Sequence, residues 1–317
     1  MLAEVQGQDE GVSFLRSFVE GKLASPLLLV GEQGIGRRFS VVQAVKEVFC
    51  TGTKEAGCEC FDCTAVTLNT HSDFMVVVPE ADKDIGVAKV RELTEEALRF
   101  PLHAPIRVIL IDGADRMTGP AANAFLKTLE EPPARTKFFL LAESFDRMLP
   151  TIQSRCGKVS YQPLHEGFIL SVVQQFETDP AKALVYARMG EGSVGRALHY
   201  WGSGRLGLRD RVYSLLQFAL KGDVSALFLT VDGIAQDLSL GLRFLDQLLY
   251  DIFMVAHDST RLINQDLTEG ISELRNSVSF DTLLELSAGV RALRSERAKV
   301  SLPFHVKTLF SRTLLVN

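Results

Sequence analysis

Short apolar runs and longer amphipathic stretches alternate along the first half of the chain. Runs of strand length occupy residues 25–30, 73–78, 106–111 and 137–142. Helical patterns lie between or after them, at residues 37–49, 87–100, 121–131 and about 149–154. The helix at 121–131 should stop at Pro132 and Pro133, because proline cannot continue a helix. Strands that alternate with helices are typical of a parallel sheet with helices on its faces, so the first half is predicted to be an α/β domain.

The strand pattern stops after about residue 163. Residues 165–201 are predicted to form a small helical unit, punctuated by Gly190, Gly192 and Gly195, and Gly202-Ser203-Gly204 is the best candidate for a linker. From residue 206 onward the pattern is helical again, with apolar positions at Phe244, Leu245, Leu248, Leu249, Ile252 and Phe253. We expect three domains: an α/β domain at 1–163, a helical lid at 164–203 and a helical domain at 204–317.

Composition narrows the class of protein. A chain of 317 residues suggests two or three domains, and 46% apolar with 23% charged residues is ordinary for a globular protein. A net charge of −5 argues against a surface coated in basic residues for wrapping nucleic acid. No secretory signal is visible at the start, and the longest apolar runs are too short to span a bilayer. We therefore expect a cytoplasmic protein without a membrane segment.

The strand at 25–30 runs into a glycine-rich turn that resembles a phosphate-binding loop. Such loops follow G-x-x-x-x-G-K-[ST]: backbone N–H groups cradle the phosphates, the lysine reaches the β- and γ-phosphates, and the hydroxyl binds Mg²⁺. Here Gly31, Gly34 and Gly36 keep the glycine-rich character, but Arg37 and Arg38 replace the lysine and the hydroxyl. Arginine is longer and planar, so this exchange is not conservative.

The second part of an ATP site should be an acidic pair at the end of the strand at 106–111. Asp112 could hold a metal ion there, but Gly113 stands where the water-activating glutamate belongs, and Asp115 follows. Without the magnesium-binding hydroxyl and this carboxylate, the electrostatics of phosphoryl transfer are incomplete. The sequence therefore predicts the remnant of a nucleotide-binding loop. We expect that this chain does not hydrolyse ATP, and its binding of ATP is in doubt.

Four of the five cysteines lie within fourteen residues, at Cys50, Cys58, Cys60 and Cys63. Four thiolates are typical of a closed, structural zinc site, whereas four free thiols in one exposed loop are the simpler but less satisfactory interpretation. His71 is an alternative ligand. The fifth, Cys156, is expected to be a small buried residue.

Several motifs together resemble the AAA+ clamp-loader subunits of bacterial DNA polymerase III. The resemblance covers residues 1–200, and its most specific parts are residues 121–133 and Ser154-Arg155-Cys156. It implies an AAA+ α/β module with an inserted zinc module at about 50–63, a helical lid and an all-helical oligomerisation collar. The family has two C-x2-C pairs, whereas here Cys58 and Cys60 are separated by one residue. The broken phosphate loop favours the delta-prime type over the ATP-hydrolysing gamma/tau type.

The resemblance also implies the partners and a role for one arginine. In this family the Ser-Arg-Cys arginine, here Arg155, enters the ATP site of the adjacent subunit, where a guanidinium stabilises the charge on the transferred phosphoryl group. The alternative is a surface arginine paired with an acid. Lys127 is a candidate for the same interface. The implied partners are the gamma/tau and delta subunits and, through the assembly, the sliding clamp and primed DNA.

Two other functions stay open at this point. The chain could be an autonomous ATPase of gamma/tau type that uses Arg37 in place of lysine, and turnover by the chain alone would reveal it. It could also bind nucleic acid through the zinc module, although Glu55, Glu59 and Asp62 make residues 50–63 a poor surface for phosphates.

Overall fold

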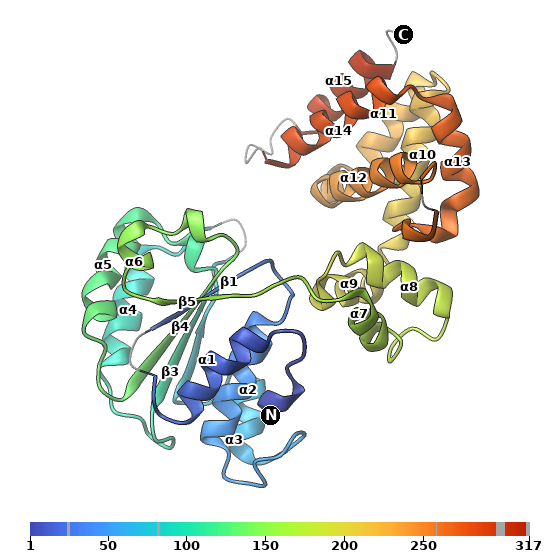
Figure 1. Cartoon of the computed structure of the whole chain (residues 1–317). Coiled ribbons are helices and arrows are strands. Elements are labelled where there is room, and N and C mark those ends of the chain that lie inside the picture. Colours follow the sequence, from blue (N-terminus) through green and yellow to red (C-terminus); the bar gives the residue numbers. More distant parts are fainter. Residues whose placement is uncertain (24–25, 81–82, 258, 296–301, 315–317) are drawn as a thin grey trace. The chain divides into compact units, whose positions relative to one another are not determined.

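The computed structural model describes residues 1–317 except 24–25, 81–82, 258, 296–301 and 315–317 (Figure 1). The described residues separate into two compact units, Met1–His165 with Gly192–Gly195, and Glu166–Glu191 with the residues after 195. The predicted division of the helical part at 203/204 stays a prediction. Among the described residues, no helix combines the length and the apolar character that a membrane span requires.

A parallel sheet forms the centre of the first unit. Its strands are β1 (Leu27–Val30), β2 (Phe74–Val77), β3 (Arg107–Asp112), β4 (Thr136–Ala142) and β5 (Gly157–Ser160). They lie in the order β2-β3-β4-β1-β5, and the neighbouring pairs are parallel. The predicted parallel α/β fold is confirmed. Ser25, with which the first predicted strand begins, lies outside the described residues.

Helices cover both faces of this sheet. They are α1 (Asp9–Val19), α2 (Arg37–Phe49), α3 (Phe61–Thr67), α4 (Val87–Ala97), α5 (Gly119–Glu130) and α6 (Pro150–Gln153). Successive strand residues point to opposite faces, so Leu27 and Phe139 join the core under α1 and α2, whereas Leu28 and Phe138 join the core under α4 and α5. In Figure 1 the two groups of helices lie on opposite sides of the sheet.

Three details of this unit differ from the sequence-based expectation. The helix predicted at 87–100 ends at Ala97, and Leu98, an apolar residue within the predicted range, is 69% exposed. The helices α1 and α3 and the strand β5 were not predicted. In β5 the side chain of Val159 is buried and its neighbours are partly or fully exposed, so no apolar run marks the strand. Its place comes from backbone pairing with β1.

The second unit is helical in its described residues. Its helices are α7 (Glu166–Val173), α8 (Pro180–Met189), α9 (Val194–Gly202, whose first residues belong to the first unit), α10 (Leu206–Leu220), α11 (Val224–Gly233), α12 (Leu238–Met254), α13 (Thr268–Ser277), α14 (Phe280–Ser295) and α15 (Leu302–Leu314). Short 3-10 turns complete the two units at Leu2–Glu4, Ala114–Arg116, Phe145–Arg147, Ala235–Asp237, Ser259–Arg261 and Gln265–Leu267. The apolar positions predicted in α12 are buried, except Phe253, which is 37% exposed. The loop after α12 is held by Asp251, whose buried carboxylate accepts hydrogen bonds from the backbone of Ile263 and Asn264.

Candidate functional site

The glycine-rich turn joins β1 to α2, as its sequence predicts. Gly36 is the N-cap of α2 with a φ of 105°, a conformation that glycine adopts without strain. A Cβ on Gly31 would lie 2.7 Å from the backbone oxygen of Tyr161, so the turn passes close to the end of β5. The strand, turn and helix N-terminus therefore have the arrangement of a phosphate loop.

The arginine in the lysine position points into the protein. Arg37 is 6% exposed, and its guanidinium donates a hydrogen bond to the backbone oxygen of Ala142, the last residue of β4. The same oxygen accepts the N–H of Gly31 at 3.1 Å. Burial lowers the pKa of Arg37, while the carboxylates of Asp112 and Glu143 oppose that shift. Arg37 thus links the glycine-rich turn to the end of β4 in its own chain.

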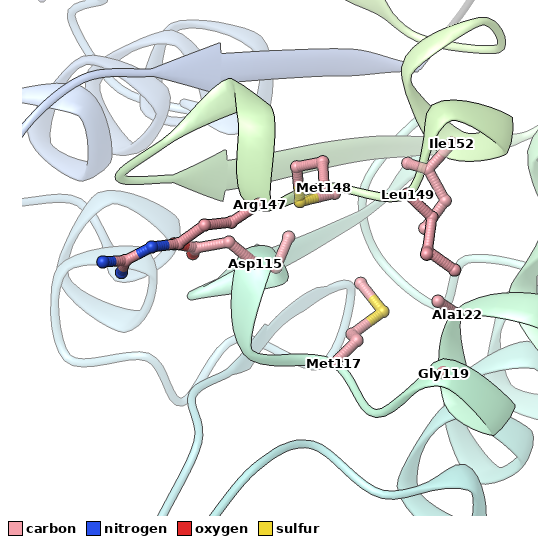
Figure 2. Close-up of a pocket in the computed structure, with 9 residues that line it drawn as sticks. Asp115, Met117, Gly119, Ala122, Arg147, Met148, Leu149 and Ile152 are labelled. Carbon is pink, nitrogen blue, oxygen red and sulfur yellow. The ribbon is translucent and has the colours of Figure 1, made fainter. Parts of the chain in front are cut away.

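The remaining residues of the expected ATP site lie around Asp112. Arg38, half-exposed, comes within 3.6 Å of Asp112, between Nη1 and Oδ2. Burial raises the pKa of Asp112, and Arg37 and Arg38 oppose this. Asp115 lies in the wall of a pocket that is also lined by Met117 and Arg147 (Figure 2). Gly113, in place of the glutamate, has a φ of 88°.

Residues 193–195, far along the chain, form hydrogen bonds with the glycine-rich turn. This contact was not predicted from the sequence. Ser193 Oγ donates to the backbone oxygen of Gln33 at 2.9 Å, and the N–H of Gly195 donates to the oxygen of Gly34, also at 2.9 Å. A Cβ on Gly195 would lie 2.8 Å from Gly34 Cα. Glycine at position 195 permits this close approach of the two backbones. Arg196, one place later, pairs with Glu191.

Arg155 follows α6 at the edge of this unit and is held by its own chain. Its Nε and Nη2 both donate to Oε1 of Glu130, the last residue of α5, with a distance of 2.7 Å from Nε. Its Nη1 donates to the backbone oxygen of Thr151 at 2.7 Å and to Ser154 Oγ at 3.3 Å. Lys127, one turn before Glu130 on α5, is exposed. Arg155 therefore lies against α5, the helix that also carries Lys127, and forms an ion pair with Glu130.

The four clustered cysteines form one group in space. Their sulfur atoms all lie within 4.8 Å of one another, with 3.6 Å between Cys50 and Cys58 and 3.9 Å between Cys50 and Cys60. A tetrahedral zinc ion with zinc–sulfur distances of about 2.3 Å requires sulfur–sulfur distances of roughly 3.8 Å. Gly52 runs beside the cluster, where a Cβ would lie 2.8 Å from the sulfur of Cys58. The residues present fit a bound zinc ion, despite the single residue between Cys58 and Cys60.

Three thiols of this group have shifted pKa values. A hydrogen bond from the backbone of Cys60 lowers the pKa of the Cys58 thiol. A hydrogen bond from the backbone of Cys63 lowers the pKa of the Cys60 thiol to about 6. Burial raises the pKa of the Cys63 thiol. Outside the group, burial of the sulfur raises the pKa of the lone Cys156 to about 12, although the residue is half-buried and not fully buried as predicted.

His71 lies outside the cysteine group, which corrects its candidacy as a ligand. Its Nδ1 accepts the N–H of Asp73 at 3.0 Å, and its Nε2 lies 3.4 Å from Oδ1 of Asp62. The other oxygen of Asp62 accepts a hydrogen bond from Thr51 at 2.7 Å. Since Thr51 follows Cys50 and Asp62 precedes Cys63, these side chains join the cysteine cluster to the start of β2.

Asp73 in turn holds the loop before β3. Its fully buried carboxylate accepts hydrogen bonds from the backbone N–H groups of Leu102, His103 and Ala104, at 2.7–2.9 Å. Arg107 Nη2 lies 3.6 Å from the same carboxylate. A line of polar contacts therefore leads from the cysteine cluster to residues 102–104.

Comparison with known proteins identifies the family of this chain. A family model described as DNA polymerase III, delta subunit, matches residues 7–165, half of the 317-residue chain. The DNA polymerase III subunit delta' of Escherichia coli (strain K12) is 29% identical over 291 residues, which cover 90% of this chain and 86% of that protein. The delta' subunit of Haemophilus influenzae is 34% identical over 142 residues, 44% of this chain and 43% of that protein. Human replication factor C subunit 4 is 25% identical over 300 residues, 89% of this chain and 78% of that protein. The chain therefore belongs to the DNA polymerase III delta subunit family, in which its bacterial relatives are delta-prime subunits.

Proposed function

We propose that this chain is a non-hydrolysing subunit of a DNA polymerase III clamp loader. It packs beside an ATPase subunit of gamma/tau type, donates Arg155 to that subunit's ATP site, and assembles with the delta subunit. Through the assembly it helps to load the sliding clamp on primed DNA. Family membership supports the assembly, and the predicted helical collar after residue 203 supplies the oligomerising part.

The observation that carries the absence of hydrolysis is the position of Arg37. The side chain that should reach the phosphates is buried and bonded to the Ala142 oxygen. The loop oxygens of Gln33 and Gly34 are also engaged, by Ser193 and the backbone of Gly195. Because phosphoryl transfer depends on positioned charges, a site without the lysine, the magnesium-binding hydroxyl and the glutamate does not turn over.

The case for Arg155 rests on its chemistry and its place. A guanidinium supplied by a neighbouring subunit stabilises the charge that builds on a transferred phosphoryl group. The side chain of Arg155 is 29% exposed and follows α6, so part of it is open to a neighbouring subunit in the proposed assembly. The cysteine cluster has a separate role: Cys50, Cys58, Cys60 and Cys63 hold a structural zinc ion that closes the loop between α2 and α3.

The test is ATP hydrolysis by the reconstituted assembly with primed DNA and clamp, comparing the wild type with Arg155→Ala and using the chain alone as the baseline. We expect no turnover by the chain alone. We expect a partial fall with Arg155→Ala, because one site loses its finger and the others continue. An unchanged rate in an intact assembly would show that Arg155 is structural, and magnesium-dependent turnover by the chain alone would favour the autonomous ATPase.

A further inference from the structure

Glu130 occupies the two nitrogens of Arg155 that form one edge of its guanidinium. Nε and Nη2 both donate to the same carboxylate oxygen, while Nη1 donates to Thr151 and Ser154. Every nitrogen of this side chain therefore has a partner within its own chain. In this arrangement the guanidinium lies against α5 and the end of α6.

The ion pair changes what the guanidinium can do for a phosphate. A transferred phosphoryl group is stabilised by a positive charge that no nearby anion neutralises. A carboxylate hydrogen-bonded to Arg155 cancels much of the electrostatic attraction between the guanidinium and such a phosphate. The edge that Glu130 occupies is also the one that binds two oxygens of a phosphate side by side. Glu130 and a phosphate on a neighbouring subunit therefore compete for Arg155.

We propose that Glu130 is a positioning residue that holds Arg155 in a retracted position until the assembly has bound primed DNA. This inference rests on the proposed role of Arg155 as a finger for the neighbouring ATP site. Release requires a change of side-chain rotamer and leaves α5 and α6 in place. The control of hydrolysis thus lies partly in a subunit that does not hydrolyse ATP.

The solvent exposure of Arg155 and Glu130 determines how strongly their ion pair holds the guanidinium. The side chains of Arg155 and Glu130 are 29% and 48% exposed, so the ion pair is partly screened by solvent. Loss of such a pair shifts the population of released arginine roughly two- to five-fold, which corresponds to about 0.5–1 kcal/mol at 1.4 kcal/mol per factor of ten. A hold of this size is easily overcome by a phosphate that binds the same edge.

The experiment measures ATP hydrolysis by the full assembly, without DNA and then with clamp and primed DNA, for Glu130→Gln. We expect the DNA-free rate at the site served by Arg155 to rise roughly two- to five-fold and the total DNA-free rate to rise by a smaller factor, while the stimulated rate stays within a factor of two of the wild type. Glu131→Gln is the matched control, because it removes the same charge one residue away and, in the described structure, Arg155 is paired with Glu130. Glu130→Asp, which keeps the charge on a shorter side chain, should give a smaller rise.

A double variant separates this inference from the proposed function. The rise caused by Glu130→Gln should disappear when Arg155→Ala is also present, because the effect acts through that guanidinium. A fall or no change with Glu130→Gln, in an assembly where Arg155→Ala lowers the rate, would overturn the inference and leave the finger in place. No effect of Arg155→Ala would instead overturn the proposed function. Gel filtration and thermal unfolding of each variant confirm that the assembly and the fold are retained.

Discussion

Gly113 packs against the ring of Pro79 in a backbone conformation that other residues rarely adopt. Its φ is 88°, and a Cβ built on it would lie 3.1 Å from both Cγ and Cδ of Pro79. Gly113 stands where an ATPase carries its water-activating glutamate. The loss of that glutamate is therefore built into the local backbone, and a single substitution does not reverse it.

We expect Gly113→Glu to destabilise the chain without giving it ATPase activity. The left-handed conformation costs a residue with a side chain about 1–2 kcal/mol, and contact with Pro79 adds to this. Urea unfolding of wild type, Gly113→Glu and Gly113→Ala measures the cost, and the alanine variant isolates the backbone contribution. Gly207→Ala, in the first turn of α10 where a Cβ meets open space, is the control and should be neutral or stabilising by up to about 1 kcal/mol. A stable Gly113→Glu chain that hydrolyses ATP would contradict this account of the site.

Asp73 is expected to contribute strongly to stability. Asp73→Ala would leave three backbone N–H groups in residues 102–104 without their acceptor, and it would remove one of the two carboxylates that contact Arg107, itself 4% exposed, leaving Glu96 as the other. Removing one partner of a buried charged pair costs about 3–5 kcal/mol, and urea unfolding should show this loss. Ser72→Ala is the control, because Ser72 is exposed and its replacement should change the free energy of unfolding by no more than about 0.5 kcal/mol. A cost below about 1 kcal/mol for Asp73→Ala would mean that water replaces the carboxylate.

The same carboxylate gives stability a defined dependence on pH. Burial by itself would raise the pKa of Asp73, but the three N–H groups and Arg107 lower it below the ordinary value of 3.8. The unfolded chain therefore binds a proton at higher pH than the folded chain does. The contribution is fully present above pH 3.8 and is lost as the pH falls through the lower pKa of the folded state. Unfolding free energies of Asp73→Asn should lack this part of the acid dependence, and an unchanged pH profile would contradict it.

Patterns within a single segment could be predicted from the sequence, and contacts between distant segments could not. The helix Arg37–Phe49 was predicted with its observed bounds, because a glycine precedes it and its apolar positions recur at helical spacing. The cysteine group was predicted because its members lie close together in the chain. The bonds from Arg37 to Ala142 and from Arg155 to Glu130 join residues 105 and 25 positions apart, and depend on which strands and helices become neighbours. Leu98 was misassigned because an exposed apolar residue after a helix continues the pattern of the buried face.

We expect the purified chain to bind one zinc ion, held by the four clustered cysteines. Cys58→Ser should abolish stoichiometric binding, because a structural site needs all four ligands. Cys156→Ser is the matched control: its thiol lies outside the group, so the variant should keep its metal. Elemental analysis by mass spectrometry measures the zinc content per chain. Equal loss of zinc from both variants would mean that the metal is bound elsewhere or adventitiously.

Removal of the metal should make residues 102–104 more mobile, because a series of polar contacts connects them to the cysteine cluster. The two ends of the cysteine cluster carry Thr51 and Asp62, Asp62 contacts His71, and His71 accepts the N–H of Asp73. Without zinc, the four sulfur atoms lose the ion that holds them together and the cluster opens, so Asp62 no longer fixes His71. We therefore expect faster amide hydrogen exchange at residues 102–104 after chelation, in addition to the faster exchange at residues 50–63.

Hydrogen exchange followed by mass spectrometry tests this coupling directly. Exchange in α5 is the internal reference, because this helix packs on the opposite face of the sheet from α2. The variant Asp62→Asn in the zinc-bound chain should reproduce part of the increase at 102–104, since it weakens the contact with His71 while the four sulfur ligands stay in place. If chelation speeds exchange at residues 50–63 alone, the polar contacts between them and Asp73 carry no mechanical coupling, and the zinc ion stabilises only its own loop.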